Sequence, residues 1–178
     1  VAFAAPTLGK IIAVDLAQTG GELICQKGAF LAGESGTEVN IAWQKRLRVG
    51  FFGGEGFIMQ RISGKGVVFI NATGALTEMT LSVGETLRVD SGCLVGLSSS
   101  VTYDIHYAGK IKTAIFGGEG LFYASLQGPG RVWIQSLPMS RLSAEIMANA
   151  LAGKRGMGGK FYVLLVIIVA LFSLFSEQ

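Results

Sequence analysis

Short apolar runs, rich in β-branched and aromatic residues and separated by glycines, recur through most of the chain. Five of them are Phe57–Met59, Val67–Ile70, Thr86–Val89, Leu121–Tyr123 and Val132–Ile134. Runs of this length and composition between turn residues are typical of β-strands. Their regular spacing predicts an all-β protein built from sandwiches or small barrels.

One further segment, Val101–Tyr107, alternates between polar and apolar residues with a period of two. In a strand this pattern places Asp104 and His106 on one face, opposite Ile105 and its aromatic neighbours. His106 is the only histidine of the chain, and a histidine beside an aspartate has the composition of a general base. Because no nucleophile-elbow pattern accompanies it, the sequence favours a polar pair on the solvent-facing side of a strand.

The chain repeats itself at a spacing of 64 residues. The run FGGEG at 52–56 recurs at 116–120, and the turn Gly64–Gly66 recurs at Gly128–Gly130. Glycines fall at the same places in both copies, as expected where the same turns must form. We therefore expect two β modules of the same fold, residues 11–74 and 75–138.

The first residues of the chain resemble the end of such a module. Val1–Phe3 is similar to Val67–Phe69, the strand that closes the first module. This similarity predicts that residues 1–10 are the last part of a preceding module, absent from this chain.

After Pro138 the apolar period changes from that of a strand to that of a helix. Met139, Leu142 and Ile146 follow helical spacing, which predicts a short amphipathic helix over residues 139–152. A basic, glycine-rich hinge over residues 153–160 comes next.

Residues 161–176 contain no charged side chain and predict a transmembrane helix that acts as a tail anchor. The basic side chains Lys154, Arg155 and Lys160 precede it. The positive-inside rule then places the β modules on the cytoplasmic side of an inner or cytoplasmic membrane, or on the matrix side in a mitochondrion. The alternative interpretations are a helix buried at an oligomer interface and, because the segment is rich in β-branched residues, a β-strand.

Composition narrows the classes of function. Half of the residues are apolar and only 15% are charged, which excludes a disordered chain. The net charge of +3 comes mostly from the hinge, so the modules are close to neutral and nucleic acid is not favoured as a partner. Cys25 and Cys93 stand far apart in apolar contexts, which favours buried structural thiols and no metal or cofactor site.

The FGGEG runs form a repeated turn motif. Its members are Gly53, Gly54, Glu55, Gly56, Gly117, Gly118, Glu119 and Gly120. An acid–base pair needs two carboxyl groups within about 10 Å of each other, whereas repeat-related glutamates are expected to lie a module apart. The runs also lack the spacing of a phosphate-binding loop, so we interpret them as structural turns.

A second repeated pattern is basic. Arg46 and Arg48 recur as Lys110 and Lys112, and each pair lies on one strand face. These four side chains are a candidate face for an anionic partner, such as lipid headgroups or RNA phosphate. An edge strand protected by charge is the alternative.

The FGGEG runs, the GKG and GPG turns and the stretch Gly128–Pro138 resemble a bacterial family of unassigned activity. Its eukaryotic relatives are the mitochondrial-biogenesis proteins named for altered inheritance of mitochondria. The resemblance extends over residues 1–138 and includes GGELI at 20–24 and GETL at 84–87. It implies tandem double-stranded β-helix modules like those of the tryptophan RNA-binding attenuation protein, commonly three per chain. For mitochondrial members it implies association with the inner membrane and its cristae-organising complex.

We therefore expect a non-enzymatic, membrane-anchored scaffold or accessory subunit that binds membrane lipid and a membrane protein complex and forms homo-oligomers. An RNA- or ligand-binding module of the β-helix ring type is the alternative. A metalloenzyme is disfavoured because such sites use several histidines and the chain has one. No catalytic, cofactor or metal residue is assigned.

Overall fold

The computed structural model describes residues 2–45, 57–107 and 122–152. The strands within these residues are β1 (Gly9–Asp15), β2 (Glu22–Gln26), β3 (Phe30–Gly33), β4 (Thr37–Lys45), β5 (Phe57–Gly64), β6 (Val67–Thr73), β7 (Leu76–Leu81), β8 (Thr86–Asp90), β9 (Leu94–Ser98), β10 (Thr102–Tyr107), β11 (Phe122–Gln127) and β12 (Gly130–Gln135). Every segment that the sequence predicts as a strand contributes to this set. The all-β prediction is confirmed.

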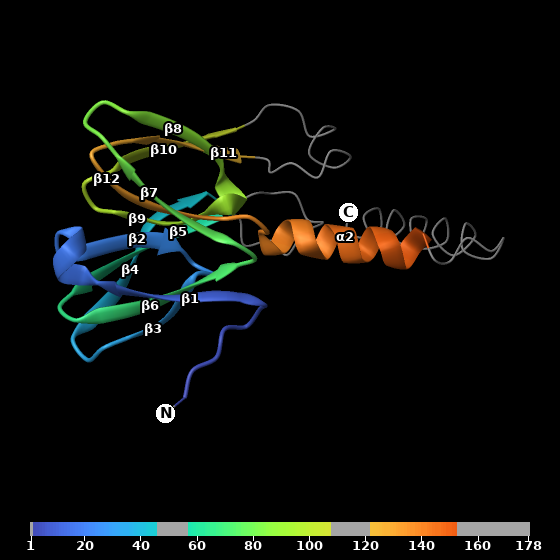
Figure 1. Ribbon diagram of the computed structural model, residues 1–178, viewed down its shortest axis with the longest axis horizontal. Helices are drawn as coiled ribbons and strands as arrows, with labels where there is room; N and C mark the ends of the chain where they lie inside the picture. The colour runs from blue at the N-terminus through green and yellow to red at the C-terminus, as the bar shows by residue number, and fades with distance from the viewer. Residues whose placement is uncertain (1, 46–56, 108–121, 153–178) are drawn as a thin grey trace, which may run out of the picture. The chain divides into compact units, whose positions relative to one another are not determined.

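The strands form three antiparallel sheets (Figure 1). Two of them have three strands, in the orders β1-β6-β3 and β10-β11-β8, and the third has six, in the order β4-β5-β2-β9-β12-β7. The three sheets belong to one compact unit, Val1–Met139, called the β unit below. Figure 1 shows β10-β11-β8 at one end of the β unit and β1-β6-β3 at the other, with the six-stranded sheet between them. The described residues therefore form packed sheets and not an open barrel.

The strands recur at the 64-residue spacing of the sequence repeat, so that β2 corresponds to β8, β3 to β9 and β6 to β12. Turn hydrogen bonds recur as well. The Gly64 N–H donates to the Gly21 carbonyl at 3.3 Å, and the Gly128 N–H donates to the Glu85 carbonyl at 3.0 Å. The series of strands is thus the same before and after Gly74, while the module limits stay predictions.

Strands β2 and β9 join the first half of the β unit, which ends at Gly74, to the second half, which follows it. Their register pairs Leu23 with Ser98, Ile24 with Leu97 and Cys25 with Gly96. A Cβ at Gly96 would lie only 3.2 Å from the carbonyl oxygen of Ile24, so a larger residue would press the strands apart. This contact, called the seam below, makes one six-stranded sheet from two three-stranded ones.

Both hydrophobic cores contain side chains from both halves. One core combines Val14, Leu23, Ile62, Val68 and Ile70 from the first half with Val95 and Trp133 from the second. The other combines Leu94, Leu97, Leu126 and Val132 from the second half with Ile24 and Met59 from the first. Side chains therefore cross between the halves in both directions, and neither half has a core of its own residues alone.

Two buried amide side chains at repeat-related positions fasten the strands. Asn71 Nδ2 donates to the carbonyls of Gly28 and Ala29 at 3.1 and 3.0 Å. Gln135 Nε2 donates to the Gly92 carbonyl at 2.9 Å, and its Oε1 accepts from the Thr73 N–H at 2.8 Å. Because a buried polar group without a partner costs about 1–3 kcal/mol, these amides fix the turns that they bind.

A second unit of the chain begins at Ser140. Helix α2 (Met139–Ala152) occupies the residues for which the sequence predicts a helix. No helix in the described part of the chain is long and apolar enough to cross a membrane. The predicted hinge at 153–160 and the predicted anchor at 161–176 lie outside the described residues.

Candidate functional site

The site residues proposed from the sequence lie outside the described residues. This holds for the turn motif Gly53, Gly54, Glu55, Gly56, Gly117, Gly118, Glu119 and Gly120, for the basic residues Arg46, Arg48, Lys110 and Lys112, and for the hinge residues Lys154, Arg155 and Lys160. Their interpretations stay predictions. The described residues present two other polar features, a platform on one outer sheet and a cleft between the halves.

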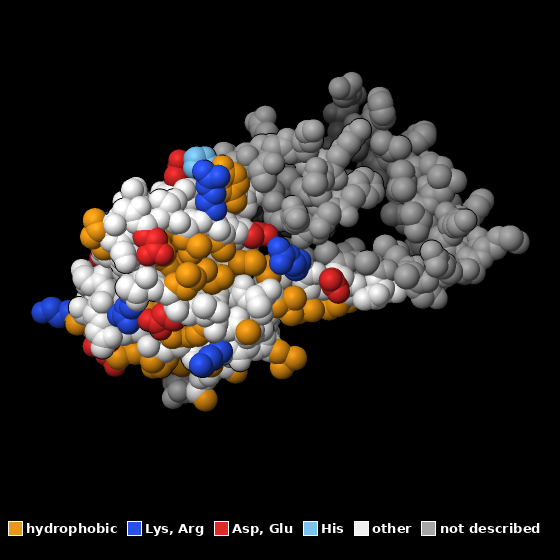
Figure 2. Space-filling model, turned by 45° about the horizontal axis from the view of Figure 1, so that its top comes forward, with side chains coloured by type: hydrophobic (Ala, Val, Ile, Leu, Met, Phe, Trp, Pro, Cys, Tyr) orange, Lys and Arg blue, Asp and Glu red, His pale blue; other side chains and the backbone are white. Residues whose placement is uncertain are grey.

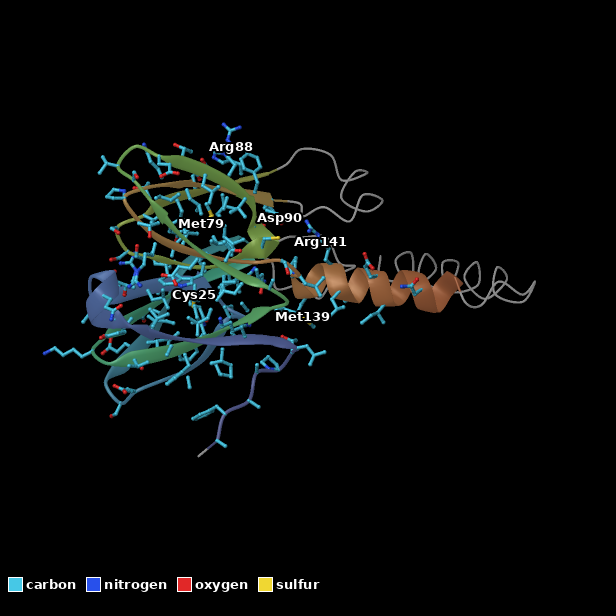
Figure 3. All side chains as sticks on the ribbon, viewed as in Figure 1. Cys25, Met79, Arg88, Asp90, Met139 and Arg141 are labelled. Carbon is cyan, nitrogen blue, oxygen red and sulfur yellow. The ribbon has the colours of Figure 1, made fainter. Side chains whose placement is uncertain are left out.

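The platform lies on the outer face of sheet β10-β11-β8 and consists of Arg88, Asp104, His106 and Tyr123. His106 Nε2 lies 3.3 Å from Asp104 Oδ2, so the two residues share a face as predicted. The imidazole stacks on the Tyr123 ring, with centroids 5.0 Å apart and planes at 23°. The Arg88 guanidinium carbon lies 6.0 Å from the Tyr123 ring centroid. Figure 2 shows the histidine among acidic, basic and hydrophobic side chains, and Figure 3 shows Arg88 projecting from β8.

The exposure of the platform suits recognition better than proton transfer. The side chains of His106 and Asp104 are 43% and 75% exposed, and an exposed pair of this kind contributes about 1 kcal/mol or less to stability. The sequence-based preference for a solvent-facing pair is confirmed. A stacked aromatic pair beside a guanidinium offers cation–π contacts and hydrogen bonds to a partner surface.

The cleft between the halves has a volume of about 210 Å³. Arg131 of β12 lines it and is held by both halves: its Nη1 lies 3.4 Å from Glu78 Oε1, and its Nη2 donates to the Gln18 carbonyl at 3.1 Å. Its guanidinium carbon lies 5.4 Å from the Trp133 ring centroid. Asp15 lines the same cleft, and its Oδ1 accepts from the Ala17 N–H at 2.9 Å.

Trp133 forms the apolar wall of the cleft and carries an unsatisfied donor. The residue is 1% exposed, and its Nε1 has no hydrogen-bond partner among the described residues. Buried indole N–H groups normally find a partner. The cleft is smaller than the roughly 300–1,000 Å³ of most ligand pockets, so it can admit only a small molecule.

Arg131 and Trp133 are not among the residues predicted from the sequence, although the repeat contains a signal for both. At the repeat spacing they replace Val67 and Phe69 of the first half. Valine becomes arginine at the first of these positions, and phenylalanine becomes the larger tryptophan at the second. The two positions lie on the same face of a strand, and a departure from the repeat at such positions indicates a different environment.

The thiols have structural environments. Cys25 is buried, Cys93 is partly buried, and neither is in a disulfide. Burial raises the pKa of the Cys25 thiol from 9.0 to about 12, which makes it unreactive near neutral pH. Within the ranges that the structure describes, no group of three or more His, Cys, Asp or Glu side chains could hold a metal ion.

Most of the chain matches a known protein family. Residues 1–137 match the family described as Mitochondrial biogenesis AIM24. An uncharacterized protein of Streptococcus pyogenes serotype M6 is 29% identical over 146 residues, which are 82% of this chain and 57% of that protein. A crystal structure of a protein from Streptococcus pyogenes has a TM-score of 0.68 and 27% identity, covering 82% of this chain and 62% of that one. The chain therefore spans less than two thirds of the length of either relative.

Proposed function

Because the chain belongs to the family described as Mitochondrial biogenesis AIM24, we propose that it is a non-catalytic scaffold or accessory subunit of a membrane protein complex. In this proposal residues 161–176 anchor the chain, and the β unit lies on the cytoplasmic or matrix side. We further propose that each module has the double-stranded β-helix fold of the tryptophan RNA-binding attenuation protein.

The observation that carries the scaffold proposal is the seam. Strands β2 and β9 make one sheet that runs through both halves, and side chains of each half are buried in the core of the other. The halves therefore cannot rotate against each other without breaking backbone hydrogen bonds and exposing apolar surface. A rigid double unit holds its outer surfaces at a fixed separation, which a scaffold requires.

Helix α2 supports the placement at a membrane. Met139 and Ile146 are 50% and 59% exposed, and their spacing of seven residues puts them on the same side of the helix. Exposed apolar residues on a helix that leads into a basic, glycine-rich segment suit the interface of an anionic membrane. The uncharged segment 161–176 follows directly after that hinge.

Extraction of membranes at high pH and high salt tests the proposal. The full chain is compared with a chain that ends at Gly153, and with a full chain in which Lys154, Arg155 and Lys160 are changed to glutamine. We expect the full chain and the glutamine variant to stay in the membrane pellet and the shortened chain to be released, since a spanning segment resists both treatments. Release of the full chain would overturn the anchor.

A second candidate function, binding of a small ligand in the cleft, is favoured by the Arg131 guanidinium, which lines the cleft beside the Trp133 ring. Ligand-observed NMR with a library of small polar molecules tests it, with Arg131→Gln as the matched variant. Binding to the native chain that weakens in the variant would support this function. Equal signals from both would exclude the cleft as the binding site.

A further inference from the structure

The outer face of the sheet β10-β11-β8 departs from the pattern of the first half. At the repeat spacing Ile24 and Met59, which the first half contributes to the core of the second, become Arg88 and Tyr123 of the platform. A face that another module covers keeps its apolar residues, whereas a polar outer face is typical of the last unit in a series of repeats. The outer face is therefore suited to water or to a polar partner.

This face does not depend on the preceding module that residues 1–10 predict. By the repeat, that module would meet β3, which lies at the opposite end of the β unit from β10-β11-β8 (Figure 1). After β12 the described chain forms helix α2 and not the first strand of another module. The polar character of the face comes from the side chains of β8, β10 and β11 themselves.

The strand register arranges nine residues of the outer face in three rows across the sheet. The rows are Thr102, Gln127 and Thr86; Asp104, Ser125 and Arg88; and His106, Tyr123 and Asp90. All nine are exposed or half-buried, whereas Ile105, Ala124 and Leu126, which alternate with them, are buried in the core. Each row runs from β10 at one edge through β11 to β8 at the other edge.

The charged groups lie at the two edges of this face. The second row has the Asp104 carboxylate on β10 and the Arg88 guanidinium on β8. The third row has the His106 imidazole on β10 and the Asp90 carboxylate on β8. The middle strand carries only the uncharged side chains of its three row residues. The face is therefore acidic at one edge and basic at the other along the second row.

A two-fold rotation about an axis along β11 brings opposite charges together. It turns a second copy face to face with the first and lays β8 of one copy over β10 of the other, with each row opposite the same row. Asp104 of each copy then faces Arg88 of the other, and His106 faces Asp90. A two-fold axis across the strands would instead place Asp104 over Asp104 and Arg88 over Arg88. The face is thus complementary to itself in the first arrangement and repulsive in the second.

We propose that the outer face of β10-β11-β8 binds the same face of a second copy, with the two-fold axis along β11. Because both copies use the same surface, the contact closes a dimer and does not extend into an array. Packed sheets lie about 10 Å apart, a distance that arginine and aspartate side chains span together. The proposal goes beyond the proposed function, which names no contact between copies, and holds whether or not the chain is anchored in a membrane.

The platform side chains can make these contacts while keeping their own. Asp104 Oδ1 accepts from the Ile105 N–H at 2.8 Å and Oδ2 lies 3.3 Å from His106 Nε2, but a carboxylate has about four acceptor sites. The stack of His106 on Tyr123 gives each face a flat aromatic surface near the axis. Nine residues are fewer than the roughly 20–30 per copy of a standard interface, so the dimer is weak and reversible.

Exchange of the charges of Arg88 and Asp104 tests both the contact and its symmetry. Arg88→Asp and Asp104→Arg are each made in the full chain in mild detergent. Sedimentation velocity at several concentrations compares the native chain, each variant and their equimolar mixture. Each variant alone would place like charges opposite each other twice, so we expect its self-association to be at least about tenfold weaker than that of the native chain. The mixture should form dimers again, because every such pair between the two variants joins opposite charges.

Controls separate the proposed contact from a general effect of charge. Glu38→Arg, a charge reversal on an exposed position of β4, should associate like the native chain. Circular dichroism confirms that each variant is folded, and added salt should weaken the native dimer because exposed charges are screened. A monomeric native chain at every concentration, variants that associate like the native chain, a mixture that stays monomeric, or equal weakening by Glu38→Arg would each overturn the proposal.

Discussion

Strands β2 and β8 occupy the same place in the repeat, yet their side chains have different environments. In β2 the sequence Leu23-Ile24-Cys25 is buried on both faces, because one face lies in the core of its own half and the other reaches the core of the second half. In β8 the corresponding Leu87-Arg88-Val89 has one half-buried face and one exposed face. Burial in this molecule is therefore decided by the neighbouring strand and not by the position within the module.

Substitution of the middle residues of β2 and β8, Ile24 and Arg88, should give the largest difference in stability between the two strands. Ile24→Arg places a guanidinium without a partner inside a core, and we expect a loss of more than about 4 kcal/mol of unfolding free energy, enough to prevent folding. Arg88→Ile should change the unfolding free energy by no more than about 0.5 kcal/mol, because the Arg88 side chain is exposed.

Urea unfolding measures both effects. If Ile24→Arg unfolded at the same urea concentration as the native chain, Ile24 would not be a seam residue. A loss of stability in Arg88→Ile as large as that in Ile24→Arg would contradict the difference in burial between β8 and β2.

Truncation of the repeat-related aromatic residues, Phe69 on β6 and Trp133 on β12, should have a smaller effect that depends on how deeply each residue is buried. Trp133→Ala should cost about 3–5 kcal/mol because it leaves a cavity at a site that is 1% exposed. Phe69→Ala, at the repeat-related site that is 36% exposed, should cost roughly 1–2 kcal/mol because less apolar surface is uncovered. Chemical denaturation of both variants at low protein concentration is the measurement, and equal costs would show that the two sites are equally enclosed.

The smallest expected effect concerns the reactivity of the two thiols, Cys25 and Cys93. Near pH 8 a thiol reagent should modify the partly buried Cys93 and not Cys25, whose pKa is raised to about 12 by burial. The folded state keeps Cys25 protonated above its ordinary pKa of 9.0, whereas the unfolded state loses the proton there. The stability that depends on the protonated thiol is therefore fully present below about pH 9, and it is lost as the pH rises toward 12.

Labelling followed by mass spectrometry after digestion measures the reactivity of each thiol. The Cys93→Ser variant is the control, since in its folded state it should take up no label. Modification of Cys25 in the native state at the same rate as Cys93 would mean that β2 opens readily at the seam.

The sequence was informative where the chemistry is local. The strand at Val67 could be predicted because a β-branched run stands between glycines, and helix α2 because its apolar residues follow a helical period. The outward side of β10 followed from the alternation around Asp104 and His106 in the same way.

The seam and the cleft could not be predicted, because they depend on contacts between distant residues. Strands β2 and β8 have the same local pattern, and each pairs on one side with the corresponding strand of its own half, β5 or β11. Only the fold decides that the second side of β2 meets β9, whereas the second side of β8 meets no strand among the described residues. Arg131 acquires its role from Gln18 and Glu78, which other elements bring to it. The repeat indicated where to look, since each of these positions departs from its counterpart.

The pairing of β2 with β9 also sets an order of events during synthesis. The ribosome completes β2 and then all of β3 to β8 before β9 emerges, and at ordinary rates of translation this interval is on the order of several seconds. During it the nascent chain carries an open β2 edge, and the β9 edge of a neighbouring nascent chain can reach it first. Adjacent ribosomes on one message therefore give this fold an opportunity for strand exchange that the finished protein, with its seam closed, no longer has.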